Sequence, residues 1–256
     1  MSVYTFLISP DTLANLKIAE QEFYNNGAEM LRTILVPDST GATVPLSSLV
    51  TTWLHGSYNL TGITRDKGDG YKADSLNKEL RNRMSTYASV FKGETYIEDG
   101  CFLHAANKGF DFAMYDEIYN LQHLRNVYIG SKGRLEGAKR LEELYKQFNM
   151  DKKNWIAKIT PYLDKPMHDI KESQNVLTVV GELQFGNWAL VNHDLLRLMN
   201  ASNEVTISLY IYITSTGDLT NKLSDNIVTF NKFKNTFEEN KSIIKTPIWL
   251  IGLDEA

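Results

Sequence analysis

The 256-residue chain is poor in cysteine and has no long apolar run, and each absence excludes a class of protein. A single cysteine, Cys101, excludes an internal disulfide framework and a zinc site with several cysteine ligands. No stretch reaches the roughly 18 apolar residues of a transmembrane helix, and the first residues lack the pattern of a secretory signal. We therefore expect no membrane span and a reducing, cytoplasmic compartment.

Motifs for several kinds of cofactor are also missing. The glycine patterns of nucleotide-binding loops do not occur, which disfavours a nucleotide cofactor. The five histidines show no paired-ligand spacing, and there is no serine-nucleophile elbow. The composition, with 43% hydrophobic and 23% charged residues, is that of an ordinary folded protein.

Charge is distributed unevenly along the chain. The net charge of −4 argues mildly against a nucleic-acid binder, but residues 125–172 carry 11 Lys/Arg against 7 Asp/Glu, a net of +4. This basic middle segment is compatible with a charged cleft, and an ordinary solvated face is the alternative interpretation. If the segment binds DNA, Lys152 and Lys153 are candidates for phosphate contacts.

Hydrophobic periodicity indicates an α/β protein. In the first half, Ser9-Pro10-Asp11 has the form of a helix start, residues 61–73 have the composition of an exposed loop, and helical spacing extends over 75–91. Another helix is expected over 134–148. We therefore interpret residues 1–130 as a mainly helical N-terminal elaboration or subdomain whose role the sequence leaves open.

The second half alternates strands and helices. Residues 168–172 and 176–184 are predicted to form a hairpin, followed by a helix over 188–200, a strand over 205–214, a helix over 225–239 and a strand from Pro247. Tyr210 and Tyr212 share one face of the 205–214 strand, which indicates that both faces are covered. This alternation predicts a central mixed β-sheet flanked by helices.

One acidic residue ends an otherwise apolar strand. Glu182 follows VLTVVG, and Gln184 shares its sheet face because it is two residues further on. A carboxylate there is costly to desolvate unless it has a partner. Asp169, on the preceding predicted strand, can lie beside it, and two converging carboxylates suit Mg²⁺. The other interpretation of the spacing is a hairpin with ordinary exposed acids.

These residues also resemble a known signature. Asp169, then Glu182-Leu183-Gln184 and Phe185-Gly186-Asn187-Trp188, are similar to the active site of type II restriction endonucleases of the PD-(D/E)XK superfamily. The resemblance is to the BglII/BstYI branch, in which glutamine replaces the usual lysine, and it spans roughly residues 134–256. It implies a restriction-endonuclease-like nuclease core over residues 131–256.

The resemblance implies a role for each matching residue. Asp169 and Glu182 would hold Mg²⁺ with the backbone carbonyl of Leu183, Gln184 would lie near the attacking water, and Asn187 would contact DNA. The 13-residue separation of Asp169 and Glu182 is wider than that branch leads us to expect, so Glu172 is a rival for the first acid. Weaker candidates for the site are Glu142, Glu143 and His168.

The function implied by the resemblance is a Mg²⁺-dependent, site-specific double-stranded DNA endonuclease of a bacterial-type restriction system. A homodimer would cut both strands of a palindromic site. The segment 215–221, with Ser215, Thr216 and Asp218, is a candidate for base reading, and an exposed turn is the alternative. Two other functions remain open: a repair or recombination nuclease that reads DNA structure, and a non-catalytic DNA-binding protein on the same fold.

Overall fold

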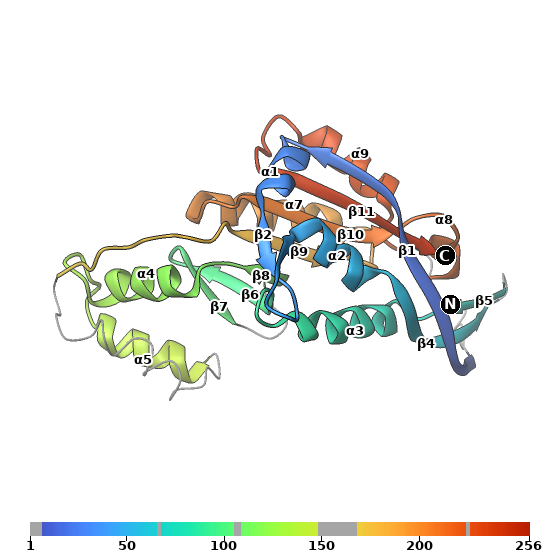
Figure 1. Cartoon of the computed structure of the whole chain (residues 1–256), viewed down its shortest axis with the longest axis horizontal. Coiled ribbons are helices and arrows are strands. Elements are labelled where there is room, and N and C mark those ends of the chain that lie inside the picture. The colour runs from blue at the N-terminus through green and yellow to red at the C-terminus, as the bar shows by residue number, and fades with distance from the viewer. Residues whose placement is uncertain (1–6, 66–67, 105–108, 148–167, 224–225) are drawn as a thin grey trace, which may run out of the picture.

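The computed structural model describes residues 7–65, 68–104, 109–147, 168–223 and 226–256. In this part of the chain it has an α/β fold with eight α-helices and a mixed sheet of nine strands in the order β5-β4-β1-β11-β10-β9-β8-β6-β7 (Figure 1). The strands of this sheet are β1 (Leu7–Tyr24), β4 (Gly56–Arg65), β5 (Gly68–Tyr71), β6 (Lys92–Glu98), β7 (Cys101–His104), β8 (Phe110–Met114), β9 (Val179–Leu183), β10 (Leu209–Ser215) and β11 (Ile248–Glu255). The other elements are α1 (Gly27–Thr33), β2 (Leu35–Pro37), β3 (Thr43–Pro45), α2 (Leu46–Leu54), α3 (Ala73–Met84), a 3₁₀ turn (Ser85–Tyr87), α4 (Glu117–Ile129), α5 (Gly137–Gln147), α7 (Leu190–Glu204), α8 (Gly217–Lys222) and α9 (Phe230–Asn240).

The centre of the sheet confirms the predicted α/β core. Strands β9, β10 and β11 are parallel, and every residue of β9 and β10 is buried. Ile211 and Ile213 pack in the cluster that contains α1, α2 and α3, whereas Tyr210 and Tyr212 pack in the cluster that contains α7 and α9. Both faces of β10 are therefore covered by helices, as the two tyrosines indicated.

The N-terminal segment differs from the helix predicted for it. β1 is an 18-residue strand that pairs with β11 and with β4, both antiparallel. Ala14 and Leu16 are buried whereas Leu13 is 64% exposed, which is the alternation of a strand with one covered face. Pro10 lies where the β1–β4 register shifts, and such an irregularity accommodates a residue that cannot donate to the ladder. The expected mainly helical elaboration is wrong, because pairing along both edges of β1 outweighs the local helix-start signal.

Strands from both halves of the sequence form one sheet. Residues 7–114 contribute six of its strands and residues 179–255 contribute three. Most of the expected loop at 61–73 is the β4–β5 pair, in which Gly62 lies opposite Tyr71. The helix expected over 75–91 is confirmed in large part by α3. The domain boundary near residue 130 stays a prediction.

The predicted hairpin before β9 is not formed. Residues 168–178 contain no strand, and they run along α4, where Asn126 bonds to both the amide and the carbonyl of Ile170. β9 instead pairs antiparallel with β8 and parallel with β10. Helices α7 and α9 and strand β11 confirm the remaining elements expected in this half, and α5 confirms most of the helix expected over 134–148. In the described part of the chain, no helix is long and apolar enough to cross a membrane.

Candidate active site

Strands β8 and β9 place two carboxylates close together. Phe112 pairs with Gly181, and Asp111 and Glu182 are the next residues beyond this pair on the two antiparallel strands. The two acids are close enough for the charge of Asp111 to raise the pKa of Glu182. The Asp111 carboxylate also accepts a hydrogen bond of 2.7 Å from the backbone amide of Leu183. The acid beside Glu182 is therefore Asp111, which precedes it by 71 residues.

Glu182 lies in a buried, charged environment. Its side chain forms an ion pair with Arg197 of α7, and the residue is only 4% exposed. Burial raises the pKa of Glu182 well above its ordinary value, and the nearby charges of Asp111 and Asp194 raise it further, while Arg197 acts in the opposite direction. Arg81 of α3 forms the corresponding ion pair with Asp111. Each acid is thus held by one guanidinium group from a helix packed on the sheet.

Gln184 belongs to a hydrogen-bonded network that is centred on the buried carboxylate of Asp194. Its Nε2 donates to Asp194 Oδ2 at 3.0 Å, and its Oε1 accepts from the backbone amide of Gly186 at 3.1 Å. Tyr212, which lies beside Glu182 in the β9–β10 register, donates its hydroxyl to the same Asp194 oxygen at 3.0 Å. Burial raises the pKa of Asp194, and its Oδ1 lies 3.6 Å from Arg197 Nη1.

The acid pair has the donor chemistry of a divalent-cation site. Asp111, Glu182 and the carbonyl of Leu183 supply hard oxygen atoms, which Mg²⁺ and Ca²⁺ prefer. Among the described residues, no group of three or more His, Cys, Asp or Glu side chains is arranged to hold a metal ion. Two carboxylates and a backbone carbonyl do not require a third side chain. Because Asp111 raises the pKa of buried Glu182, a cation between them would relieve a repulsion already present.

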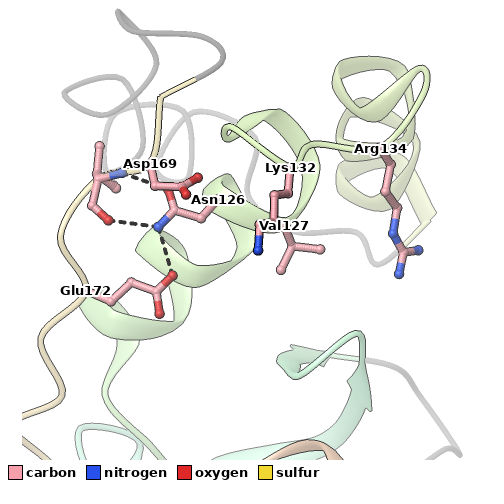
Figure 2. A pocket seen from close by; sticks show the side chains of 7 residues that line it. Asn126, Val127, Lys132, Arg134, Asp169 and Glu172 are labelled. Carbon is pink, nitrogen blue, oxygen red and sulfur yellow. Dashed lines mark hydrogen bonds between the residues drawn. The ribbon is translucent and has the colours of Figure 1, made fainter.

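Asp169 and Glu172 lie elsewhere, at the end of α4 (Figure 2). Asp169 accepts hydrogen bonds from the amide and hydroxyl of Ser131, and these bonds lower its pKa. Glu172 bonds to His123 at 3.1 Å and to Asn126 at 2.8 Å. Both acids line an open cavity of about 510 Å³. The prediction that one of them lies beside Glu182 is wrong, because residues 168–172 follow α4 and form no strand next to β9.

The weaker candidates are also not brought to Glu182. Glu142 and Glu143 are exposed on α5, and Glu143 lies 3.7 Å from Arg140. His168 is exposed, and its carbonyl accepts a hydrogen bond from Arg125. Lys152 and Lys153 lie outside the described residues.

The segment 215–221, expected to read bases from a loop, consists of the end of β10 and most of helix α8. Ser215 ends β10 and Thr216 precedes α8, and both residues are buried. The hydroxyl of Ser215 lies 3.3 Å from the carbonyl of Val228 and that of Thr216 bonds to Glu20, so both have partners inside the protein. The expectation of an exposed loop at these two positions is wrong, because they continue a buried strand. Asp218, on α8, is exposed.

Asn187 is exposed in the turn that leads from β9 to α7. Its Oδ1 accepts a hydrogen bond of 3.0 Å from the amide of Ala189, just before α7 begins. The side chain therefore has a local structural role, while its exposure leaves it accessible to DNA. A base contact by Asn187 stays a prediction.

Sequence analysis did not identify Asp111, Asp194 or Arg197. Asp111 interrupts the apolar segment Phe110–Met114, which lies in a region that received no assigned element. Asp194 occupies the helical stripe of Val191, Leu195 and Leu198 and is as buried as these residues. An acid on an apolar strand or helical stripe is costly to bury unless it has a partner. This cost is the signal by which Asp111 and Asp194 could have been found in the sequence.

The comparison with protein families defines the class of protein. The family model described as "Restriction endonuclease BglII/BglIII" matches residues 122–253, which is just over half of the chain. The match includes β9, α7, β10 and most of β11, and identifies a type II restriction endonuclease, which cuts double-stranded DNA at specific sites. The chain belongs to the restriction endonuclease BglII/BglIII family, and the resemblance seen in the sequence is confirmed. No curated protein matches the chain.

Proposed function

We propose that this endonuclease hydrolyses DNA with Mg²⁺ held by Asp111, Glu182 and the backbone carbonyl of Leu183. The observation that carries the proposal is the proximity of two carboxylates just beyond the last residue pair of β8 and β9, with Glu182 buried. Such an ion, when bound, activates a water molecule and neutralises charge on the scissile phosphate. In this proposal Asp111 has the metal-binding role that the family resemblance implied for Asp169.

The other residues of the site orient these groups. Arg81 and Arg197 fix the directions of the two carboxylates through their ion pairs. Gln184 lies two residues beyond Glu182, and we assign to its amide the positioning of the attacking water beside the phosphate. Because both ends of this amide are already hydrogen-bonded, its orientation is set before DNA arrives.

A homodimer is the second part of the proposal. The described residues of one chain supply one such acid pair, and a pair for each strand of the duplex would come from two chains. A twofold axis would bring two identical sites to the two strands of a palindromic sequence. The measurement is the mass of the protein in solution with and without DNA.

The experiment that tests the proposed chemistry is cleavage of a mixed-sequence plasmid with Mg²⁺ and with a chelator. We expect discrete fragments that require the metal, and their loss in Glu182→Gln. The matched control is Glu239→Gln, which makes the same change at an exposed position on α9 and should leave the fragments unchanged. Structure-dependent nicks would indicate a repair nuclease, and intact DNA that is still bound would indicate a non-catalytic protein.

A further inference from the structure

Asp194 is a buried carboxylate that has no place among the metal-binding residues proposed above. It lies on α7 and is 1% exposed, ten residues after Gln184 in the sequence. Burying a carboxylate is costly unless donors compensate it. Its donors here are Gln184 and Tyr212, and both residues adjoin Glu182: one follows it along β9, and the other pairs with it from β10.

The hydrogen bonds leave the Gln184 amide a single orientation. Its NH₂ group points to Asp194 and its carbonyl oxygen receives the amide of Gly186. Reversing the amide would set an oxygen against the Asp194 carboxylate and an NH₂ group against the Gly186 N–H. Asp194 therefore determines which end of the Gln184 side chain faces each neighbour.

We propose that Asp194 is a positioning residue that acts on DNA cleavage through Gln184. The inference rests on the proposed function, in which Gln184 acts beside the attacked phosphate. Asp194 itself faces the protein interior and is not assigned a contact with DNA or metal. Tyr212 holds the other side of the same Asp194 oxygen, so the carboxylate is fixed from β10 as well as from β9.

The geometry separates the effect of the hydrogen bonds from the effect of the charge. Gln184 and Tyr212 both donate to Oδ2, whereas Oδ1 faces Arg197 Nη1 at 3.6 Å. In Asp194→Asn the side-chain oxygen can take the place of Oδ2 and keep both hydrogen bonds while the negative charge is lost. In Asp194→Ala both donors lose their acceptor. A positioning role is therefore retained by asparagine and removed by alanine.

The test is a double-mutant cycle on the rate of cleavage. The variants are Gln184→Ala, Asp194→Ala and the combination of both, with Asp194→Asn as the conservative change. Single-turnover cleavage of a plasmid fragment that the parent enzyme cuts is measured with Mg²⁺, and binding of the same fragment is measured with a chelator. We expect each alanine variant to lose about 10- to 100-fold in rate with little change in binding. The double variant should be no slower than the slower single variant, and Asp194→Asn should lose less than about tenfold.

A matched control separates positioning from loss of stability. Asp116 is likewise a buried aspartate, and it accepts backbone hydrogen bonds from Ile118, Tyr119 and Asn175. Asp116→Ala should lower the melting temperature without a comparable fall in the cleavage rate. If Asp194→Ala does not fold, Asp194→Leu takes its place, because it fills the site without offering an acceptor.

Three outcomes overturn the inference. These are a further rate loss when Asp194→Ala is added to Gln184→Ala, a loss confined to DNA binding, and an asparagine variant as slow as the alanine variant. Glu182→Gln is measured in parallel. Full cleavage by that variant would reject the proposed metal site, whereas an inactive Glu182→Gln together with additive Asp194 and Gln184 effects would reject only the role of Asp194.

Discussion

This protein has two groups, each of one aspartate and one glutamate, in which the pKa of one acid is shifted in opposite directions. Asp111 and Glu182 lie close together at the sheet, where Glu182 is buried and its pKa is raised. Asp169 and Glu172 lie at the end of α4, where Asp169 is exposed and its pKa is lowered by hydrogen bonds from Ser131. Both groups have polar partners, so the presence of partners does not distinguish them.

The difference shows what suits an acid to a cation. Asp169 keeps its charge at little cost, because water and the Ser131 donors already stabilise it. Glu182 is shielded from water and lies near two other acids, so its charge is only partly compensated by Arg197. A divalent cation is therefore stabilised more strongly by the buried acids Asp111 and Glu182 than by Asp169 and Glu172. Burial and strand pairing, rather than distance along the sequence, therefore define the site.

The largest expected effect concerns the two acid groups directly. Asp111→Asn should abolish Mg²⁺-dependent cleavage, with a rate loss on the order of 10³-fold or more, because the metal loses a charged ligand. Asp169→Asn is the matched change in the other group and should cut DNA at the parent rate. Plasmid cleavage checks both variants. An active Asp111→Asn beside an inactive Asp169→Asn would reverse our assignment of the first acid.

The next largest effect is expected at Gln184, which lies two residues after Glu182 and bonds to Asp194. In Gln184→Lys we expect the ammonium group to reach Asp194, because the glutamine amide already lies 3.0 Å from that carboxylate. The new charge pair should raise the melting temperature. Cleavage should not improve and should fall about tenfold, since the added cation opposes Mg²⁺ binding nearby. A variant as fast as the parent would show that position 184 accepts either chemistry.

The stability of the metal-free protein should depend on pH in opposite ways at the two groups. The raised pKa of Glu182 means that the folded state binds more protons than the unfolded state above the ordinary value of 4.5. Its contribution to stability is therefore lost as pH rises, and Glu182→Gln should gain on the parent protein as pH rises above that ordinary value. The lowered pKa of Asp169 contributes stability above the ordinary value of 3.8, and that contribution is lost in acid.

Thermal melts in a chelator at three pH values, in strong acid, near pH 5 and near pH 8, check both signs. The advantage of Glu182→Gln over the parent should grow with pH, whereas Asp169→Asn should show a disadvantage that disappears only in strong acid. Equal pH dependence of Glu182→Gln and parent would contradict the electrostatic difference between the two groups.

The smallest expected effect is at Asn187, beside the buried group. Asn187→Ala should lower stability by about 1 kcal/mol, because the Ala189 amide loses its acceptor. If Asn187 also contacts a base, the variant loses about 1–3 kcal/mol of binding to the cognate site and discriminates less at one base pair. Asn126→Ala, at the α4 group, should lower stability alone. Titrations with cognate and single-mismatch duplexes decide, and unchanged discrimination by Asn187→Ala would reject the base contact.

Local sequence was sufficient for the elements that lie around Glu182. The alternation in residues 205–214 and the apolar stripe of α7 are short-range patterns, and both elements form close to where they were expected. Glu182 and Gln184 share a face because strand residues alternate, so their relation needed no tertiary information. The same local features carried the family resemblance.

Local sequence was misleading where pairing between distant segments decides the structure. Ser9-Pro10-Asp11 has the chemistry of a helix start, yet β1 forms because both of its edges pair with other strands. Asp169 was predicted beside Glu182 because it lies on the preceding expected strand and matches the family signature, with Glu172 as the rival. The true neighbour of Glu182 belongs to β8, on the far side of the intervening residues 115–178.

The order of residues alone was therefore sufficient for the chemistry of the strand that we propose to be catalytic, because Glu182, Leu183 and Gln184 occupy consecutive positions whose geometry is set by the backbone. Which groups surround that strand depends on the three-dimensional fold. The pairing of β8 with β9 brings in Asp111, and the packing of α7 on the sheet brings in Arg197 and Asp194. These contacts depend on burial and strand order, which are properties of the whole fold and leave no fixed spacing in the sequence.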